Sequence, residues 1–342
     1  MKKIRLYIFS FLFLLIFVLS QNTSFMEWWA DYRVQKLHAP YTRARYGDIY
    51  SSCFLPQFMD TTHKKLKEYK TTKTNIDLYM LHDSYLAGQI KKENFIGVDK
   101  LILSDFRGEG ACACLDRKKK NILIIECSER TADWRLTDTS LSYPKLYAKR
   151  TKALKNILAQ KKEKSLLKIF FNPFINQNLE FILFDYEFFK LLKETKARTN
   201  FKTFDKLPAD IAVSSDKKYL LLNETIDLHR FESSFRWLSN RDIDNIVYLI
   251  NLTEIHYKNL GFDEVYFSII PNPVSIIDSE RYLYNYKISR IKNTIWLNAK
   301  FIDVFDVFKK SKKRIYRRDD SHWNNDGLQL WVDQVNSKLL SY

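Results

Sequence analysis

Two distant segments of the chain carry the residue types that nucleophilic catalysis needs. The segment LHDSYL places Ser84 directly after a short apolar run, and the segment DDSHW near the end of the chain holds His322 behind two aspartates. A histidine can take the proton of a serine hydroxyl, and a nearby carboxylate can hold the imidazole in the correct tautomer. Ser84 and His322 are therefore candidates for nucleophile and base, and either Asp320 or Asp319, two or three residues before His322, is a candidate for the orienting acid.

Structural roles compete with this interpretation. A serine after a buried strand is more often a helix N-cap than a nucleophile, and taken alone Ser84 favours the cap. The Asp-x-His loop at the far end of the chain reverses that preference. The side chains of His82, Asp83, Asp320 and His322 could also bind a metal, but no compact ligand pattern exists, so we predict neither a metal nor another cofactor.

Short apolar runs that end in polar residues alternate with segments of helical spacing. This alternation predicts an α/β sandwich with a mainly parallel sheet, in which ligands bind beyond the carboxyl ends of the strands. The expected strands lie in the segments NIDLYMLHDSY, DKLILSD, KNILIIECSER and FDEVYFSIIPNP. The expected helices lie in LYAKRTKALKNILAQ, RDIDNIVYLINLTEIHYKNL and NAKFIDVFDVFKK.

Several polar residues at or near these strand ends could stabilise an oxyanion or contact a substrate. The backbone N–H of Ser84 and those of the next turn are expected to face the same pocket. Glu126, Glu129 and Arg130 could equally form an ion pair that fixes the end of a strand. The candidates for oxyanion or substrate contacts are Asp83, Gly88, Glu126, Arg130, Asn272 and Trp323, and Gly108 is a further oxyanion candidate.

Three of these segments resemble a known superfamily. LHDSYL looks like the nucleophile block of the SGNH (GDSL-like) esterases, and DDSHWNNDG is similar to the Asp-x-His-Trp loop of the branch that contains the alginate O-acetylation proteins. NILIIECSERT resembles the strand ending in Glu-Arg in that branch. The resemblance implies a three-layer α/β/α fold, no metal, and serine-dependent acyl-ester chemistry, often acetyl transfer to or removal from an exported polysaccharide. It assigns Ser84 as nucleophile, His322 as base and Asp320 as orienting acid.

The chain also departs from that pattern. His82 stands where the family has glycine before the Asp-Ser pair, and no clean counterpart of the oxyanion glycine or of the Gly-x-Asn block is present. The Asp-His pair follows the serine, whereas it precedes the serine in the alginate proteins. The wider superfamily places its acid three residues before the histidine, which keeps Asp319 open. A non-catalytic SGNH-like module that binds acidic glycan, or that partners a membrane-bound acyltransferase, is the alternative function.

The first 20 residues predict export. Three positive charges precede an apolar run from Leu6 to Leu19, which fits a signal peptide cleaved after Ser20. A retained anchor fits equally, because Trp28, Trp29 and Tyr32 could lie at a membrane interface. Both alternatives place the remaining chain outside the cytoplasm, in a periplasm or at the cell surface.

The net charge of +16 favours anionic binding partners. Export argues against nucleic acid, and the lysine runs are typical of solvated helix faces and loop edges. They could also attract anionic lipid headgroups or an acidic polysaccharide. The resemblance to the SGNH superfamily implies an acylated polysaccharide substrate, with a membrane-bound acyltransferase as a candidate partner, and the charge adds contact with a membrane surface as an expectation. A disulfide between Cys53 and Cys112 or Cys114 is left open.

The expected domain organisation has three parts. Residues 1–20 form the signal or anchor, residues 21–75 a lead-in segment, and residues 76–342 one SGNH-like domain. Residues of about 139–235 have no clear place in the sheet. We expect them to form a helical insertion on that domain, and we do not expect a separate domain.

Overall fold

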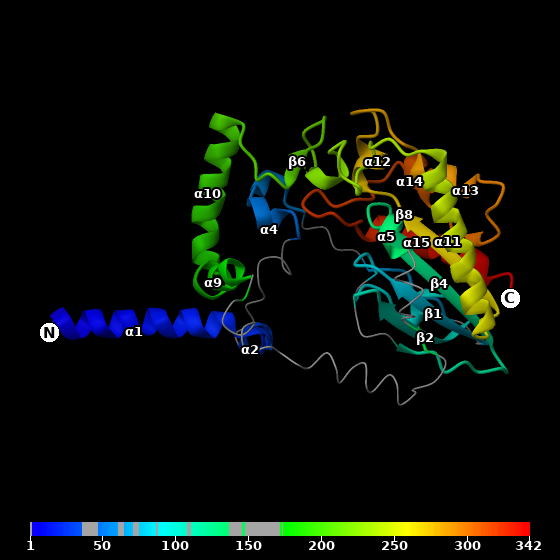
Figure 1. The fold of residues 1–342 in the computed structure, drawn as a ribbon, viewed down its shortest axis with the longest axis horizontal. Coiled ribbons are helices and arrows are strands. Elements are labelled where there is room, and N and C mark those ends of the chain that lie inside the picture. Colours follow the sequence, from blue (N-terminus) through cyan, green and yellow to red (C-terminus); the bar gives the residue numbers. More distant parts are fainter. Residues whose placement is uncertain are drawn as a thin grey trace. The chain divides into compact units, whose positions relative to one another are not determined.

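The computed structural model describes most of the chain as two compact units. The described residues are 2–35, 47–60, 65–70, 75–86, 88–107, 111–136, 146–147, 172 and 174–342. The first unit comprises Met1–Met59 and Lys152–Pro208, and the second comprises Asp60–Thr151 and Ala209–Tyr342. Both units are drawn in Figure 1.

A parallel sheet forms the centre of the second unit. Its five strands lie in the order β2-β1-β4-β8-β9, and every neighbouring pair is parallel. Their bounds are Ile76–His82 for β1, Val98–Asp105 for β2, Lys120–Ser128 for β4, Glu264–Ile270 for β8 and Lys300–Phe301 for β9. Since β1, β4 and β8 are buried almost throughout, their unbroken apolar runs are what a sheet covered on both faces requires.

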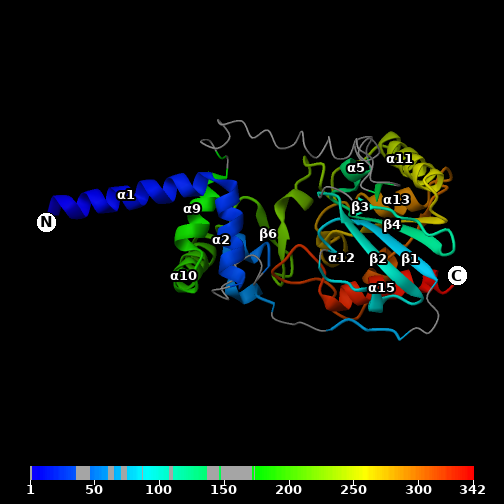
Figure 2. The same ribbon diagram turned by 90° about the horizontal axis from the view of Figure 1, so that it is seen from below.

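Helices cover both faces of this sheet. Successive side chains of a strand point to opposite faces, so Tyr79 and Leu81 enter one hydrophobic cluster while Leu78 and Met80 enter the other. The first cluster includes residues of α11 (Asn240–Asn259) and α13 (Lys287–Lys292), and the second includes residues of α14 (Phe305–Lys310) and α15 (Asn325–Leu339). Figure 2 shows α11 and α13 on one side of the sheet and α15 on the other. The predicted α/β sandwich is confirmed.

The strand order creates a switch point beside β1. The chain passes from β1 to β2 on one side and then crosses back to β4 on the other, after which it continues outward to β8 and β9. In open α/β sheets, the crevice at such a reversal is where ligands bind. The residues that follow β1 and β4 therefore occupy the position that this topology favours for a site.

The remaining elements of the second unit are short. They are β3 (Ala111–Cys112) paired with β5 (Leu146–Tyr147), β6 (Ile211–Val213) paired with β7 (Leu220–Leu222), the helices α5 (Ala132–Arg135) and α12 (Pro273–Ile277), and the 3-10 turns η2 (Lys92–Asn94) and η3 (Asn223–Thr225).

The first unit is helical, and polar contacts hold its two chain segments together. Asn178 donates a side-chain N–H to the carbonyl of Ser20 at 2.7 Å, and Arg33 lies 3.4 Å from the Asp185 carboxylate. Tyr50 donates to Glu194 at 2.5 Å. Its helices are α1 (Lys2–Gln21), α2 (Thr23–Gln35), α4 (Tyr50–Cys53), α9 (Ile175–Phe184) and α10 (Glu187–Phe204), with a 3-10 turn η1 at Pro56–Phe58.

This division differs from the expected single insertion at residues 139–235. Residues 175–204 belong with the N-terminal helices because they supply the polar partners of α1, α2 and α4, whereas residues 211–235 belong to the sheet unit. Residues 137–145 and 148–171 lie outside the described residues. The helix expected across 298–310 is wrong in its first half, since Lys300 and Phe301 pair with β8 and the helix begins only at Phe305.

Helix α1 is apolar and long enough to cross a membrane. Within the described ranges it is the helix that meets this test, with 19 residues from Lys3 to Gln21 and a mean hydropathy of 2.1. Roughly 20 apolar residues span a bilayer as a helix, and a signal sequence has the same properties. Most of its large apolar side chains are exposed.

Gly327 brings the histidine loop against the first turn of α15. Asn324 caps this helix by accepting the backbone N–H groups of Asp326 and Gly327. A Cβ at position 327 would lie 2.4 Å from the carbonyl oxygen of Ile315 and 2.9 Å from the Cβ of Trp323. Glycine is therefore required by the close approach of the loop that carries His322.

We expect Gly327→Ala to destabilise the second unit by about 1–3 kcal/mol, because the methyl group would displace the backbone of Ile315 and the side chain of Trp323. Thermal unfolding of the purified chain measures this, with the exposed Lys338→Ala on the same helix as control. A melting temperature of Gly327→Ala equal to that of the control would contradict the packing described.

Candidate active site

The carboxyl end of β1 carries the candidate nucleophile. Ser84 lies in the turn two residues past the last residue of β1. His322 lies on the loop that precedes α15, and a backbone bridge between Tyr316 and Trp323 closes that loop. Both Ser84 and His322 are partly exposed, so a substrate can reach them from solvent.

The side chains of Ser84, His322 and Asp320 form one chain of hydrogen bonds. His322 Nε2 lies 2.7 Å from Ser84 Oγ, and His322 Nδ1 lies 2.5 Å from Asp320 Oδ1. With the ring proton on Nδ1 and donated to Asp320, Nε2 is left to accept the serine proton. The backbone N–H of His322 also donates to Asp320 Oδ1 at 3.0 Å, which fixes the carboxylate relative to the ring.

Asp319 has a different task. It is fully buried, accepts the backbone N–H of Asp60 at 2.9 Å and accepts Arg317 Nε at 3.0 Å. Burial raises the pKa of the Asp319 carboxyl, and the bonds from Asp60 and Arg317 oppose that rise. Both oxygens are therefore engaged in holding the loop, and the geometry favours Asp320 over its rival as the partner of His322.

Tyr85 and Trp323 fasten the two catalytic segments to each other. The Tyr85 hydroxyl donates to the carbonyl of Ser321 at 2.8 Å, and the Trp323 indole N–H donates to the carbonyl of Tyr85 at 3.1 Å. The two rings meet edge to face at 5.1 Å, and the Tyr85 ring lies 4.7 Å from that of His322. Trp323 is buried and acts in this packing, whereas the sequence offered it as a substrate contact.

Asp83 is held as an anion beneath the nucleophile turn. Thr131 donates to one of its oxygens at 2.9 Å, and Arg135 lies 3.3 Å from the other. Burial raises the pKa of Asp83, but Arg135, Thr131 and the N–H of Ser84 outweigh that effect, so the pKa is lowered.

The N–H of Ser84 is already committed. It donates to Asp83 Oδ1 at 2.9 Å, so the expectation that it faces an oxyanion pocket is not met in this arrangement. The cause is the neighbouring carboxylate, which is a stronger acceptor than solvent for an N–H one residue away.

Glu126 is a second carboxyl group under the same turn. It is fully buried at the end of β4 and accepts the backbone N–H of Asp83 at 3.0 Å. Burial and the nearby charge of Asp83 raise the pKa of Glu126 to about 8. Its second oxygen has no hydrogen-bond partner among the residues that the structure describes. Glu126 is therefore a largely protonated acid at neutral pH beside an ionised Asp83.

The ion pair that the sequence left open for Arg130 with Glu126 or Glu129 is not formed within the described part of the chain. Arg130 lies in the turn after β4, and its Nη1 is buried without a hydrogen-bond partner there. Glu129 accepts hydrogen bonds from the backbone of Asn272 at 2.9 Å and from the Ser275 and Tyr284 hydroxyls. Arg130 Nη1 is therefore a donor without a hydrogen-bond partner among the described residues, and Arg130 directly precedes Thr131, which contacts Asp83.

The other oxyanion candidates are placed elsewhere. The Asn272 side-chain amide donates to Ser234 at 2.9 Å and belongs to the network around Glu129. Gly88 is exposed in the turn after Ser84, with a positive φ of 68° that explains the glycine. Gly108 lies outside the described residues.

Three contributors were not identified from the sequence. Tyr85 directly follows the nucleophile, and Thr131 and Arg135 follow the end of β4. The signal that could have found Thr131 and Arg135 is their position after a strand expected to neighbour β1.

Comparisons of the chain with protein-family models, with curated proteins and with solved structures find no match.

The raised pKa of Glu126 predicts a pH-dependent stability. Between its ordinary value of 4.5 and about 8, the folded protein binds more protons than the unfolded chain, so stability falls as the pH rises through this window. A Glu126→Gln variant removes this titration. The quantity to compare is the unfolding free energy of Glu126→Gln minus that of the unsubstituted protein. We expect this difference to be larger at pH 8 than at pH 5 by at least about 1 kcal/mol.

Chemical denaturation at both pH values measures this difference, with the exposed Glu68→Gln as the matched control. A difference that is the same at pH 5 and pH 8 would show that Glu126 does not titrate in this window.

Proposed function

We propose that this protein is a serine-dependent enzyme of acyl-ester chemistry, an O-acyl esterase or acetyltransferase. One observation carries the proposal: Ser84 Oγ, both ring nitrogens of His322 and the Asp320 carboxylate form a continuous chain at 2.7 and 2.5 Å. These groups come from segments more than 230 residues apart. A serine that served only as a helix cap would not need an imidazole held by a carboxylate.

The arrangement supports a two-step reaction. The Ser84 hydroxyl attacks the ester carbonyl while its proton passes to His322 Nε2, and Asp320 stabilises the imidazolium through Nδ1–H. The tetrahedral intermediate then expels the alcohol, which takes the proton from Nε2 and leaves an acyl group on Ser84. Water or a sugar hydroxyl next gives its proton to His322 Nε2 and attacks the acyl carbonyl. As the bond between the acyl group and Ser84 Oγ breaks, His322 returns the proton to that oxygen, which restores the Ser84 hydroxyl and the neutral imidazole.

The substrate class follows from the SGNH resemblance and the charge. An acetylated, exported polysaccharide fits the acyl-ester chemistry of that superfamily, and the net charge of +16 would attract an acidic one. Arg130, with its buried unpaired Nη1 in the turn beside the site, is the side chain that we propose contacts the substrate or its oxyanion.

We propose further that α1 is retained as an anchor and that the sheet unit is extracytoplasmic. The end of α1 is integrated into the first unit, because Ser20 is fully buried and its carbonyl accepts Asn178. Gln21 accepts the backbone N–H of Asn172 at 2.9 Å. Cleavage after Ser20 would remove the helix that these contacts hold. Lys2, Lys3 and Arg5 at the start of α1 favour a cytoplasmic N-terminus.

A second candidate function is supported by the commitment of the Ser84 N–H to Asp83. An enzyme needs donors aimed at the oxyanion, and removal of one such donor typically lowers kcat by about 100-fold or more. A module that binds acidic glycan without turnover, or that partners a membrane-bound acyltransferase, would not need that donor.

Covalent labelling separates the two candidates. We expect the full chain to react with a fluorophosphonate probe and to hydrolyse a small acetyl ester, and we expect both activities to be lost in Ser84→Ala. The control is Ser337→Ala, an exposed serine on α15. A folded native chain that neither reacts with the probe nor hydrolyses the ester would favour the non-catalytic module.

The acid can be assigned with a matched pair of variants. We expect Asp320→Asn to lower kcat by about 10³–10⁴-fold, because the imidazole loses the acceptor that fixes its tautomer. Asp319→Asn should lower kcat much less and should instead lower the melting temperature, since Asp319 holds Asp60 and Arg317. Steady-state kinetics on the acetyl ester and thermal unfolding measure both. Equal losses of kcat in two stably folded variants would reject this assignment.

A further inference from the structure

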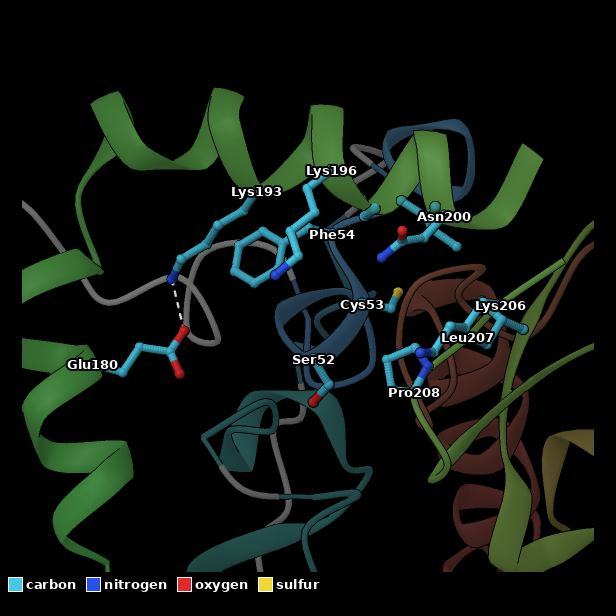
Figure 3. Close-up of a pocket in the computed structure, with 12 residues that line it drawn as sticks. Ser52, Cys53, Phe54, Glu180, Lys193, Lys196, Asn200, Lys206, Leu207 and Pro208 are labelled. Carbon is cyan, nitrogen blue, oxygen red and sulfur yellow. Dashed lines mark hydrogen bonds and ion pairs between the residues drawn. The ribbon is translucent and has the colours of Figure 1, made fainter. Parts of the chain in front are cut away.

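Helix α10 in the first unit has two unlike faces. One face is directed at residues 50–58: Tyr50 donates to Glu194, the Lys193 ammonium lies 4.8 Å from the Phe54 ring centre, and the Phe58 and Phe201 rings meet at 6.4 Å. Figure 3 shows Lys193, Lys196 and Asn200 projecting from α10 toward this segment, around a cavity of about 420 Å³. This inner face already has its partners.

The outer face of α10 begins with apolar side chains that nothing covers within the described part of the chain. Phe188, Leu191 and Leu192 stand at i, i+3 and i+4 and are 76%, 68% and 58% exposed. Such spacing places them on one side of the helix, away from Lys193 and Glu194. Phe184 at the end of α9 is also 46% exposed. In a water-soluble protein, such an apolar stripe normally packs against the hydrophobic core.

Two threonines continue this face without adding polarity. The Thr195 hydroxyl donates to the carbonyl of Leu191 at 2.8 Å, and the Thr199 hydroxyl donates to the carbonyl of Thr195 at 3.0 Å. Because each hydroxyl proton is bonded within the helix, the residues present mainly their methyl groups. A hydrocarbon environment tolerates threonines that are satisfied in this way.

The second half of the outer face is basic. Arg198 and Lys202 lie in the same helical register as Leu191 and Thr195 and are exposed. Neither forms an ion pair with another described residue. Apolar and cationic groups on one face are typical of helices that lie in the headgroup region of an anionic bilayer.

The position of α10 relative to α1 fits a bilayer as the covering surface. In Figures 1 and 2 the axis of α10 runs across that of α1, near the end of α1 that contacts α9. Figure 1 shows α4 on the side of α10 away from the N-terminus of α1, so the outer face is on the side to which α1 extends. On α2, at the same end of α1, the exposed rings of Trp28 and Tyr32 stack at 5.5 Å, as interfacial aromatic residues do.

We infer that the outer face of α10, formed by Phe188, Leu191, Leu192, Thr195, Thr199, Arg198 and Lys202, lies in the headgroup region of the membrane that α1 spans. The first unit would then have two membrane contacts, a spanning helix and an interfacial one. This inference rests on the proposed retention of α1, and it is independent of the proposed acyl-ester chemistry.

Site-specific photocrosslinking tests the inference on the full chain in nanodiscs of phosphatidylethanolamine and phosphatidylglycerol. The photoreactive residue p-benzoylphenylalanine replaces Phe188 or Leu192 on α10, Phe11 in α1, or Tyr248 on α11. Tyr248 is the matched control, because it is an aromatic residue 62% exposed on a helix of the sheet unit. We expect roughly tenfold more lipid adduct from positions 188 and 192 than from position 248, measured by intact mass.

Each outcome has a definite meaning. Lipid adducts at position 11 with background levels at 188 and 192 would overturn the inference and leave the anchor in place. Background levels at all of positions 11, 188 and 192 would overturn both. Adducts at 188 and 192 that are mainly to protein would also overturn the inference, because another chain and not lipid would then cover this face.

Discussion

The candidate site depends on two reciprocal hydrogen bonds between segments that are far apart in the chain. The Tyr85 hydroxyl donates to the backbone of Ser321, and the Trp323 indole donates to the backbone of Tyr85. Each bond joins residues adjacent to the pair that must meet, Ser84 and His322. Since both bonds are buried, breaking either leaves an unsatisfied polar group and is costly. The separation of serine and imidazole is thus set by the backbone as well as by the side chains that react.

Beneath the nucleophile turn, two carboxyl groups are kept in different protonation states. Asp83 stays ionised because Arg135 and Thr131 face it, while Glu126 is buried and has its pKa raised. Two charged carboxylates in so small a volume would repel each other, and the protonated Glu126 avoids this. The same arrangement draws the Ser84 N–H to Asp83. The turn is therefore well fixed, and its least conventional feature is the engagement of that donor.

The two units differ in how they treat their apolar side chains. The sheet unit buries its strands on both faces and presents its polar residues at the switch point beside β1. The first unit leaves large apolar side chains exposed on both α1 and α10, which is costly in water and favourable in a bilayer. A protein whose proposed substrate is an exported polysaccharide would gain from such a division, because attachment to the membrane and chemistry place conflicting demands on one surface.

The sequence by itself determined the parallel α/β core, since short unbroken apolar runs that alternate with segments of helical spacing are typical of strands covered on both faces, and it identified Ser84, His322 and the neighbouring aspartates by their chemistry. Only the tertiary structure decided between Asp320 and Asp319, because adjacent residues on a turn point in different directions and local spacing does not fix which one meets the ring. The same holds for Tyr85, Thr131 and Arg135, whose partners are distant in the chain. That residues 175–204 group with the N-terminal helices could not be predicted, because their partners in α1 and α2 lie about 150 residues away, a separation that no local pattern records.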